Sequence, residues 1–188
     1  MEELVTCEGT VHSIIFQNAE NGYTVLRLLT EEGEVITVVG CIPCVAPGEH
    51  LAVSGVPETH PQHGEQLRAV ELERSLPEDE EEIFSYLSSG ICKGVGPATA
   101  RRIVERFGAE TLDVLEREPE RLTTLKGVTA RKAQEIAESF RQHMGLRRLM
   151  AFLAQYQLPP VLAMELRRQY GDAALEKVRE NPYLLLSL

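Results

Sequence analysis

A tripeptide that recurs at a fixed distance constrains the fold of this chain more than any other feature. Lys93-Gly94-Val95 returns 33 residues later as Lys126-Gly127-Val128. The apolar residues that follow match at the same offset: Ala100 with Ala133, Ile103 with Ile136 and Phe107 with Phe140. Their spacing has the 3.6-residue period of a helix. The sequence therefore predicts a duplicated unit of helix, tight glycine turn and helix. Solenoids also have repeats of this length, but they need three or more stacked copies.

The residues of this turn are suited to hold a phosphate group. Glycine permits positive φ, and its missing side chain lets a ligand approach the backbone. The turn leads into a helix N-terminus, where unpaired N–H groups and the helix dipole favour an anion. Pro97 has no N–H group, so its neighbours must supply the donors. The candidate contacts are Lys93, Gly94, Val95, Gly96, Ala98, Thr99, Arg101 and Arg102 in the first copy, and Lys126, Gly127, Val128, Thr129, Arg131 and Lys132 in the second.

The second copy departs from the first at one position. Thr129 stands where the first copy has Gly96. A threonine there is expected either to cap the following helix or to bind phosphate through its hydroxyl. Contact of the second turn with an anion is therefore left open.

The first 76 residues have a different pattern. Five short β-rich runs, separated by turn residues, occupy 4–15, 23–29, 35–39, 50–56 and 66–72. Five strands without an intervening helical pattern suit a small barrel, and the Greek-key OB-fold is the best candidate at this size. A small β-sandwich is the alternative.

Charge is divided unevenly between the two parts. Residues 1–80 contain 15 acidic and 3 basic side chains, a net charge of −12, whereas residues 81–188 contain 14 acidic and 16 basic ones, a net charge of +2. Residues 91–148 reach +4, with 12 basic and 8 acidic side chains. The total of −10 therefore does not exclude a polyanion, and the second half is where we expect it to bind.

Residues 92–100 closely resemble the helix-hairpin-helix motif of DNA-binding proteins, and residues 125–133 resemble a weaker copy that lacks the second glycine. The family contacts the DNA backbone through such hairpins, usually without reading base sequence. We accordingly predict an α+β chain. An OB-like barrel covers 1–76, a tandem helix-hairpin-helix domain covers 77–145, and a further helical unit covers 146–188.

The whole chain resembles the amino-terminal region of RecD-like DNA helicases, which are related to the alpha chain of exodeoxyribonuclease V. The resemblance is carried by these segments: Asn18 to Leu26, Pro47-Gly48-Glu49 with Gly55, His60 to Gln66, Tyr170-Gly171-Asp172 and Glu180 to Tyr183. The resemblance implies a parent enzyme that couples ATP hydrolysis to 5′-to-3′ unwinding in DNA repair and recombination.

This chain has no G-x-x-x-x-G-K-[ST] phosphate loop. We therefore expect an amino-terminal fragment without catalytic residues or a cofactor of its own, whose absent motor domain binds ATP and Mg²⁺. DNA and that motor are the expected partners, and the acidic barrel is expected to contact an unidentified protein. Without an apolar run of membrane-spanning length, and with four cysteines but no secretory leader, we expect a cytoplasmic location and no membrane contact.

Other interpretations depend on single features. The Holliday-junction-binding subunit of the branch-migration machinery shares a small barrel followed by tandem hairpins, and a protein-interaction scaffold is a third class. Phe16 and Tyr23 are candidate base-stacking side chains, but the acidic barrel favours packing of both in its core. A zinc site is a minor alternative that needs Cys41, Cys44, His60 and His63.

Overall fold

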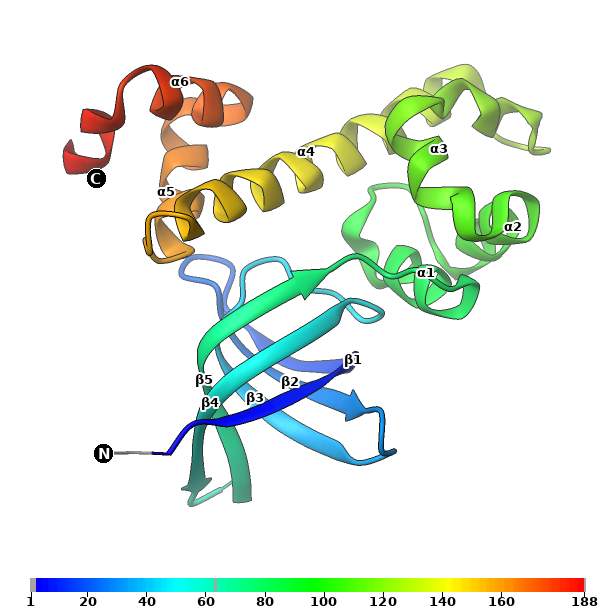
Figure 1. The fold of residues 1–188 in the computed structure, drawn as a ribbon. Helices are drawn as coiled ribbons and strands as arrows, with labels where there is room; N and C mark the ends of the chain where they lie inside the picture. The colour runs from blue at the N-terminus through cyan, green and yellow to red at the C-terminus, as the bar shows by residue number, and fades with distance from the viewer. Residues whose placement is uncertain (1–2, 63, 188) are drawn as a thin grey trace.

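The computed structural model describes residues 3–62 and 64–187, and it consists of a β-barrel with a helical region packed over one end (Figure 1). The strands are β1 (Val5–Gln17), β2 (Tyr23–Thr30), β3 (Val35–Cys41), β4 (His50–His60) and β5 (Gly64–Ser75). They close in the order β1-β2-β3-β5-β4, with β3 parallel to β5 and β4 antiparallel to β1. The predicted five-stranded barrel is confirmed, and the alternative sandwich is wrong.

Alternation along the strands separates the barrel core from its outer surface. Leu26 and Leu28 on β2 and Val38 on β3 are fully buried inside. Phe16 and Tyr23, by contrast, lie on the outside with 52% and 43% of their surfaces exposed. The expectation that both pack in the core is wrong, because the β1 bulge and the β2 register turn them away from it.

The helical region begins where Asp79 caps α1 by accepting the N–H of Glu82 at 2.8 Å. The acidic run after the barrel is thus the first turn of a helix, where negative charge complements the dipole. In chain order, the helical elements are α1 (Glu80–Tyr86), η1 (Leu87–Ile91), α2 (Pro97–Phe107), η2 (Gly108–Glu110), α3 (Thr111–Arg117), η3 (Pro119–Thr124), α4 (Ala130–Ala154), α5 (Val161–Tyr170), η4 (Gly171–Ala173), α6 (Ala174–Glu180) and η5 (Pro182–Ser187).

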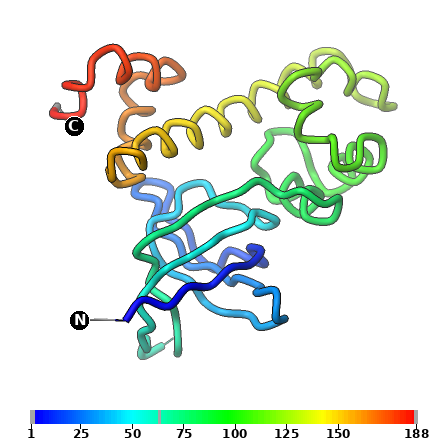
Figure 2. The backbone as a smooth tube through the Cα atoms, in the orientation of Figure 1, coloured from blue at the N-terminus to red at the C-terminus, as the bar shows by residue number. Residues whose placement is uncertain are grey.

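One long helix joins the two helical cores. The first half of α4 packs into a core with α1, α2 and α3, and its second half packs into another with α5 and α6. Figure 2 shows this path, with α4 crossing from the hairpin region to α5 above the barrel. The domain boundary predicted at 145/146 falls within α4, because Gly145 lies in the helix interior and does not end it. The three-domain division itself remains a prediction.

A buried ionic cluster fixes the barrel against α4. Glu49, directly before β4, is fully buried, and its carboxylate accepts hydrogen bonds from Arg74 on β5 and Arg147 on α4. The Arg74 Nη2 to Glu49 Oε1 distance is 3.1 Å. Removing either partner of such a pair leaves an uncompensated buried charge. The cluster therefore holds the helical region in one orientation relative to the barrel.

A second buried contact lies beside this cluster. The Tyr86 hydroxyl of α1 is hydrogen-bonded to His143 Nε2 of α4. Burial lowers the pKa of His143 to about 4, so the imidazole is neutral near pH 7. Burial also raises the pKa of Tyr86. Both side chains are therefore uncharged, as their position between packed helices requires.

Candidate nucleic-acid interface

The two predicted turns, hairpin 1 (residues 92–96) and hairpin 2 (residues 125–129), have the same backbone geometry. Gly94 and Gly127 both have φ of +87°. Val95 N–H donates to the carbonyl of residue 92 at 3.3 Å, and Val128 N–H donates to that of residue 125 at 3.2 Å. Both valines are almost fully buried. The structure thus repeats the turn that the sequence repeats.

Glycine at position 96 is required neither by the backbone nor by packing. Gly96 has φ of −95° and ψ of −178°, an extended conformation that any residue adopts. A Cβ atom added there would meet no heavy atom within 4 Å. The absent side chain therefore leaves open space directly at the N-terminus of α2, where a ligand can approach the backbone.

The two helices that follow the hairpins begin differently. No side chain caps α2, whose first turn contains Pro97, exposed Ala98 and half-buried Thr99. At the start of α4, Thr129 Oγ1 accepts the N–H of Lys132 at 3.1 Å. The Thr129 cap is one of the two roles that the sequence left open. Of these two helices, α2 keeps its first-turn N–H groups free of a side-chain cap and α4 does not.

Hairpin 1 is held in place by the second repeat. Ser139, on α4, accepts the N–H of Lys93 at 2.9 Å and donates to the carbonyl of Ile91 at 3.4 Å. Lys93 itself is exposed. Ser139 was not identified from the sequence, because a single serine on a predicted helix gives no signal of a contact 46 residues away.

The fold also brings the basic residues of the two repeats together. A Cβ added to Gly127 would lie 3.8 Å from Arg102 Nη2. Arg102 of the first repeat therefore lies against hairpin 2, and the cations of both repeats contribute to one surface. The exposed basic side chains there are Lys93, Arg102, Lys126 and Arg131.

Two of the predicted arginines have carboxylate partners within the chain. Arg101 Nη1 lies 3.2 Å from Glu81 Oε1, and the Arg101 guanidinium lies 3.8 Å from the centre of the Phe84 ring. Arg131 Nε lies 3.6 Å from Glu135 Oε1, but 91% of the Arg131 side chain is exposed. Arg101 is thus directed toward α1, whereas Arg131 is free to exchange its partner. The roles of all fourteen predicted contact residues remain a prediction.

A third turn follows α4, and the sequence reasoning missed it. The signal is a second offset of 63 residues, which matches Pro97 with Pro160, Ala100 with Ala163, Phe107 with Tyr170, Gly108 with Gly171 and Pro119 with Pro182. Gly108 has φ 57° and ψ −135°, and Gly171 has φ 61° and ψ −138°. The segment from α2 to η3 is therefore repeated as the segment from α5 to η5.

The third turn keeps a positive φ at the position of Gly94 but lacks the groups that bind phosphate. Gln157 adopts φ of +59° at the position of Gly94. Tyr156 replaces the lysine, and Pro159 and Pro160, which have no N–H groups, stand at the positions of Gly96 and Pro97. The third turn is consequently a poor anion site.

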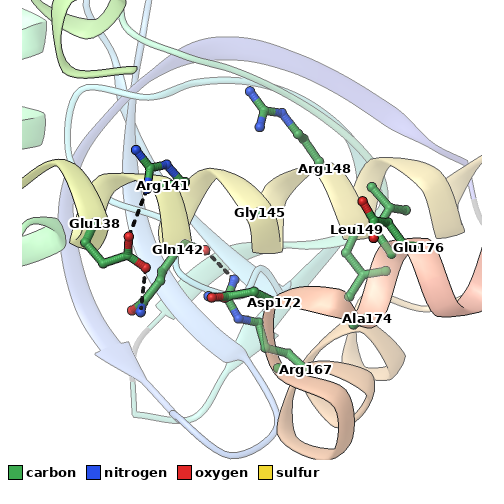
Figure 3. A pocket seen from close by; sticks show the side chains of 12 residues that line it. Glu138, Arg141, Gln142, Gly145, Arg148, Leu149, Arg167, Asp172, Ala174 and Glu176 are labelled. Carbon is green, nitrogen blue, oxygen red and sulfur yellow. Dashed lines mark hydrogen bonds and ion pairs between the residues drawn. The ribbon is translucent and has the colours of Figure 1, made fainter. Parts of the chain in front are cut away.

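A groove of about 240 Å³ lies between α4 and the α5–α6 segment (Figure 3). Arg141, Arg148 and Arg167 line it, but each is paired with a carboxylate. Their partners are Glu138, Glu116 and Asp172, respectively. Arg167 also donates to the backbone carbonyl of Gln142. The groove therefore presents balanced charge and is a weaker candidate for an anion than hairpin 1.

Within residues 3–62 and 64–187, no three or more His, Cys, Asp or Glu side chains are placed to hold a metal ion. His63, one of the four residues of the alternative zinc site, lies outside this range. In the same described part of the chain, no helix is long and apolar enough to cross a membrane.

Three family models match consecutive parts of the chain. Residues 4–77 match the OB-fold domain of the ATP-dependent DNA helicase YrrC. Residues 84–142 match a SAM-like helix-hairpin-helix tandem, and residues 141–188 match the helix-hairpin-helix domain of the ATP-dependent RecD2 DNA helicase. The predicted tandem hairpins are thereby confirmed.

Similar proteins agree with these models. The ATP-dependent RecD2 DNA helicase of Deinococcus radiodurans is 29% identical over 184 residues, which cover 94% of this chain and 26% of that protein. The chain thus spans about a quarter of the length of that relative. A chain of the S. pombe Stn1–Ten1 complex is 21% identical to this chain, with a TM-score of 0.32. The match covers 38% of this chain and 57% of that one, and the similarity is too low to support a conclusion. The predicted resemblance of this chain to the amino-terminal region of RecD-like DNA helicases is confirmed.

Proposed function

We propose that the chain binds the DNA backbone for a RecD-like helicase, and that hairpin 1 makes the main phosphate contact. The open space at Gly96, beside an uncapped helix N-terminus, is the observation that carries this proposal. Free N–H groups and the dipole of α2 attract a phosphate there. Lys93 adds positive charge within hairpin 1, and Arg102 adds it beside hairpin 2.

Backbone binding of this kind does not depend on base sequence. Lysine, arginine and main-chain N–H groups contact phosphates, which are the same at every step of the duplex. Binding therefore releases counterions and weakens as salt rises. The acidic barrel does not oppose it, since the positive surface belongs to the helical region.

The rest of the function belongs to a longer protein. We infer that this region serves a motor domain that binds ATP and Mg²⁺ and unwinds duplex DNA in repair and recombination. The matched domains favour this assignment over a Holliday-junction-binding protein or a scaffold module. All four cysteines are free, which suits the reducing cytoplasm that we propose as its location.

Adding a side chain at Gly96 tests the proposal. Gly96→Val fills the open space without straining the backbone, so the thermal unfolding midpoint is expected to stay unchanged. The matched control is Ala109→Val, at an exposed residue of η2. In a fluorescence anisotropy titration at low salt, we expect Gly96→Val to weaken binding of a labelled duplex about fivefold or more, and the control to bind normally. Normal binding by Gly96→Val would overturn the assignment of hairpin 1.

A further inference from the structure

The third turn and η5 expose large apolar side chains where the first repeat has polar ones. Tyr156, Tyr183 and Leu186 are 64%, 77% and 82% exposed. The residues 63 positions earlier are a lysine, a glutamate and a threonine. Within the described helical residues 77–187, every exposed large apolar side chain lies after residue 155. The third copy of the repeat therefore has a different kind of surface from the two hairpins.

The repeat also shows what covers the equivalent element of the first copy. In η3, Leu122 is fully buried in a core that it shares with Ile136 and Phe140 of α4. The equivalent residue of η5 is Leu185, which packs against the core of α5 and α6 but is only partly buried. In the part of the chain that the structure describes, no helix covers the outer side of η5 as α4 covers η3.

The exposed rings of the third turn adjoin the end of α6. The rings of Phe152 and Tyr156 have centroids 5.4 Å apart, and the Arg179 guanidinium lies 5.5 Å from the centre of the Phe152 ring. Arg179 thus places the end of α6, which leads directly into η5, beside the third turn. We call Phe152, Tyr156, Tyr183 and Leu186 together the apolar end surface.

A surface of this kind needs a protein to cover it. Contiguous exposed apolar side chains mark protein contacts, and a repeat that has no further neighbour carries a polar outer side. None of the four residues is charged, so the apolar end surface offers little to a DNA backbone, which is bound by cations and N–H groups.

We propose that the apolar end surface docks a helix of the motor domain, in the way that α4 covers η3. This inference rests on the proposed function, which supplies the motor. The RecD2 helix-hairpin-helix model matches residues 141–188, which contain the whole surface. About three quarters of the helicase relative lies outside the matched region, and that part is large enough to provide the covering helix.

The apolar end surface and hairpin 1 lie toward opposite ends of α4 (Figure 1). This helix has 25 residues and is therefore about 37 Å long. Its first half supports hairpin 1 through Ser139, and its last turn carries Phe152. Docking of the motor and binding of DNA at hairpin 1 consequently use separate surfaces that one helix connects.

Hydrogen–deuterium exchange of the 188-residue chain and of the longer, motor-bearing protein tests the proposal. In the longer protein, the amides of η5 and the third turn are expected to exchange about tenfold more slowly or less, because docking buries them. The amides of β2 provide the internal reference and are expected to exchange equally in both proteins.

A double variant connects this protection to the apolar end surface. Tyr183→Ser with Leu186→Ser changes two exposed side chains, so the unfolding midpoint of the 188-residue chain and its duplex binding are expected to stay unchanged. In the longer protein, the same variant is expected to return η5 to the exchange rate of the 188-residue chain. The matched control, Val35→Ser with Val70→Ser, changes two side chains of the barrel that are 51% and 53% exposed and is expected to leave η5 protected.

Equal exchange of η5 in the two proteins would overturn the proposal, and so would full protection in the Tyr183 and Leu186 double variant. Light scattering covers the remaining occupant. A dimer of the 188-residue chain that this variant dissociates would assign the surface to a second copy instead of the motor. The Gly96→Val variant does not touch η5, so the assignment of hairpin 1 and the docking of the motor can fail separately.

Discussion

Hairpin 1 and hairpin 2 have the same turn geometry, yet the helix that follows each turn begins in a different way. Gly94 and Gly127 share a φ of +87°, and Val95 and Val128 pack beneath the turns in the same manner. At the next position hairpin 1 has Gly96 and an uncapped helix, whereas hairpin 2 has a threonine that caps its own helix.

The comparison shows that two turns can share a backbone shape and still differ in their capacity to bind an anion. A helix N-terminus attracts a phosphate because its first N–H groups have no partner. A capping hydroxyl satisfies one of those groups and stabilises the helix by about 1 kcal/mol. Hairpin 2 therefore gains local stability where hairpin 1 keeps a site open. The third turn differs further, since Pro159 at the position of Gly96 removes the N–H group that hairpin 1 has there.

The buried contact between Tyr86 of α1 and His143 of α4 is expected to make stability depend strongly on pH. Tyr86 of α1 is hydrogen-bonded to His143, whereas the residue 33 positions after Tyr86 is Pro119, which has no hydroxyl. Because burial holds the pKa of His143 at about 4, the folded chain binds fewer protons than the unfolded chain between that pH and about 6.5. Stability is full above pH 6.5 and falls as pH decreases toward 4, by a loss on the order of 3 kcal/mol.

Chemical denaturation across this pH range measures the effect. His143→Gln has no proton to gain, so this part of the pH dependence is expected to disappear. If the wild type and His143→Gln lost stability equally on acidification, the neutral His143 would not be the cause.

The next effect compares the charges of the two turns. Lys93→Glu is expected to weaken duplex binding about tenfold, because it places a repelling charge at the open anion site. Lys126→Glu, the matched change in hairpin 2, is expected to cost about threefold or less. Binding isotherms at several salt concentrations provide the measurement, and equal losses would show that both turns hold phosphate to the same extent.

The glycines at positive φ are expected to behave alike. Gly94→Ala and Gly127→Ala each force an alanine into a left-handed conformation, at a cost of about 1 kcal/mol. The unfolding free energies of the two variants should therefore agree closely. A clear difference between them would mean that the two backbones are not equivalent.

The smallest effect on stability concerns the contact that positions hairpin 1. Ser139→Ala removes the acceptor of the Lys93 N–H and is expected to cost about 0.5–1 kcal/mol. Its distinguishing result is in hydrogen exchange, where the Lys93 amide is expected to lose protection. Unchanged exchange at the Lys93 amide would show that Ser139 does not hold hairpin 1 in place.

Much of the fold could be predicted from local patterns. Alternating strands with Gly and Pro turns revealed the barrel, and the 33-residue repeat revealed the tandem hairpins. The orientation of Phe16 could not be predicted, because bulges in β1 change which side chains face inward. Tyr23 follows the regular alternation of β2, in which Leu26 and Leu28 are buried. The contacts of Ser139 and Glu49 were also beyond reach, because their partners lie far apart in sequence.

The candidate site was predicted less completely than the fold. The basic and glycine residues of both turns could be named as candidates, and their contact with DNA remains a prediction. Charge alone does not show that Arg101 turns toward Glu81 while Arg102 reaches hairpin 2. Capping of α4 was one of the two roles left open for Thr129, and the hydrogen bond from the Lys132 N–H to the Thr129 hydroxyl shows the cap. The third turn was readable from the 63-residue offset, although its glycine is replaced by Gln157.

Exchanging the residues that distinguish the two hairpins shows whether the open helix N-terminus at Gly96 is the main DNA contact. Gly96→Thr gives hairpin 1 the cap of hairpin 2, and Thr129→Gly removes that cap at a cost of a few tenths of a kcal/mol. In duplex titrations at low salt, we expect Gly96→Thr to bind about fivefold more weakly and Thr129→Gly to bind as tightly as the wild type or about twofold more tightly. Normal binding by Gly96→Thr, or a large loss in Thr129→Gly, would contradict the assignment of hairpin 1 as the main DNA contact.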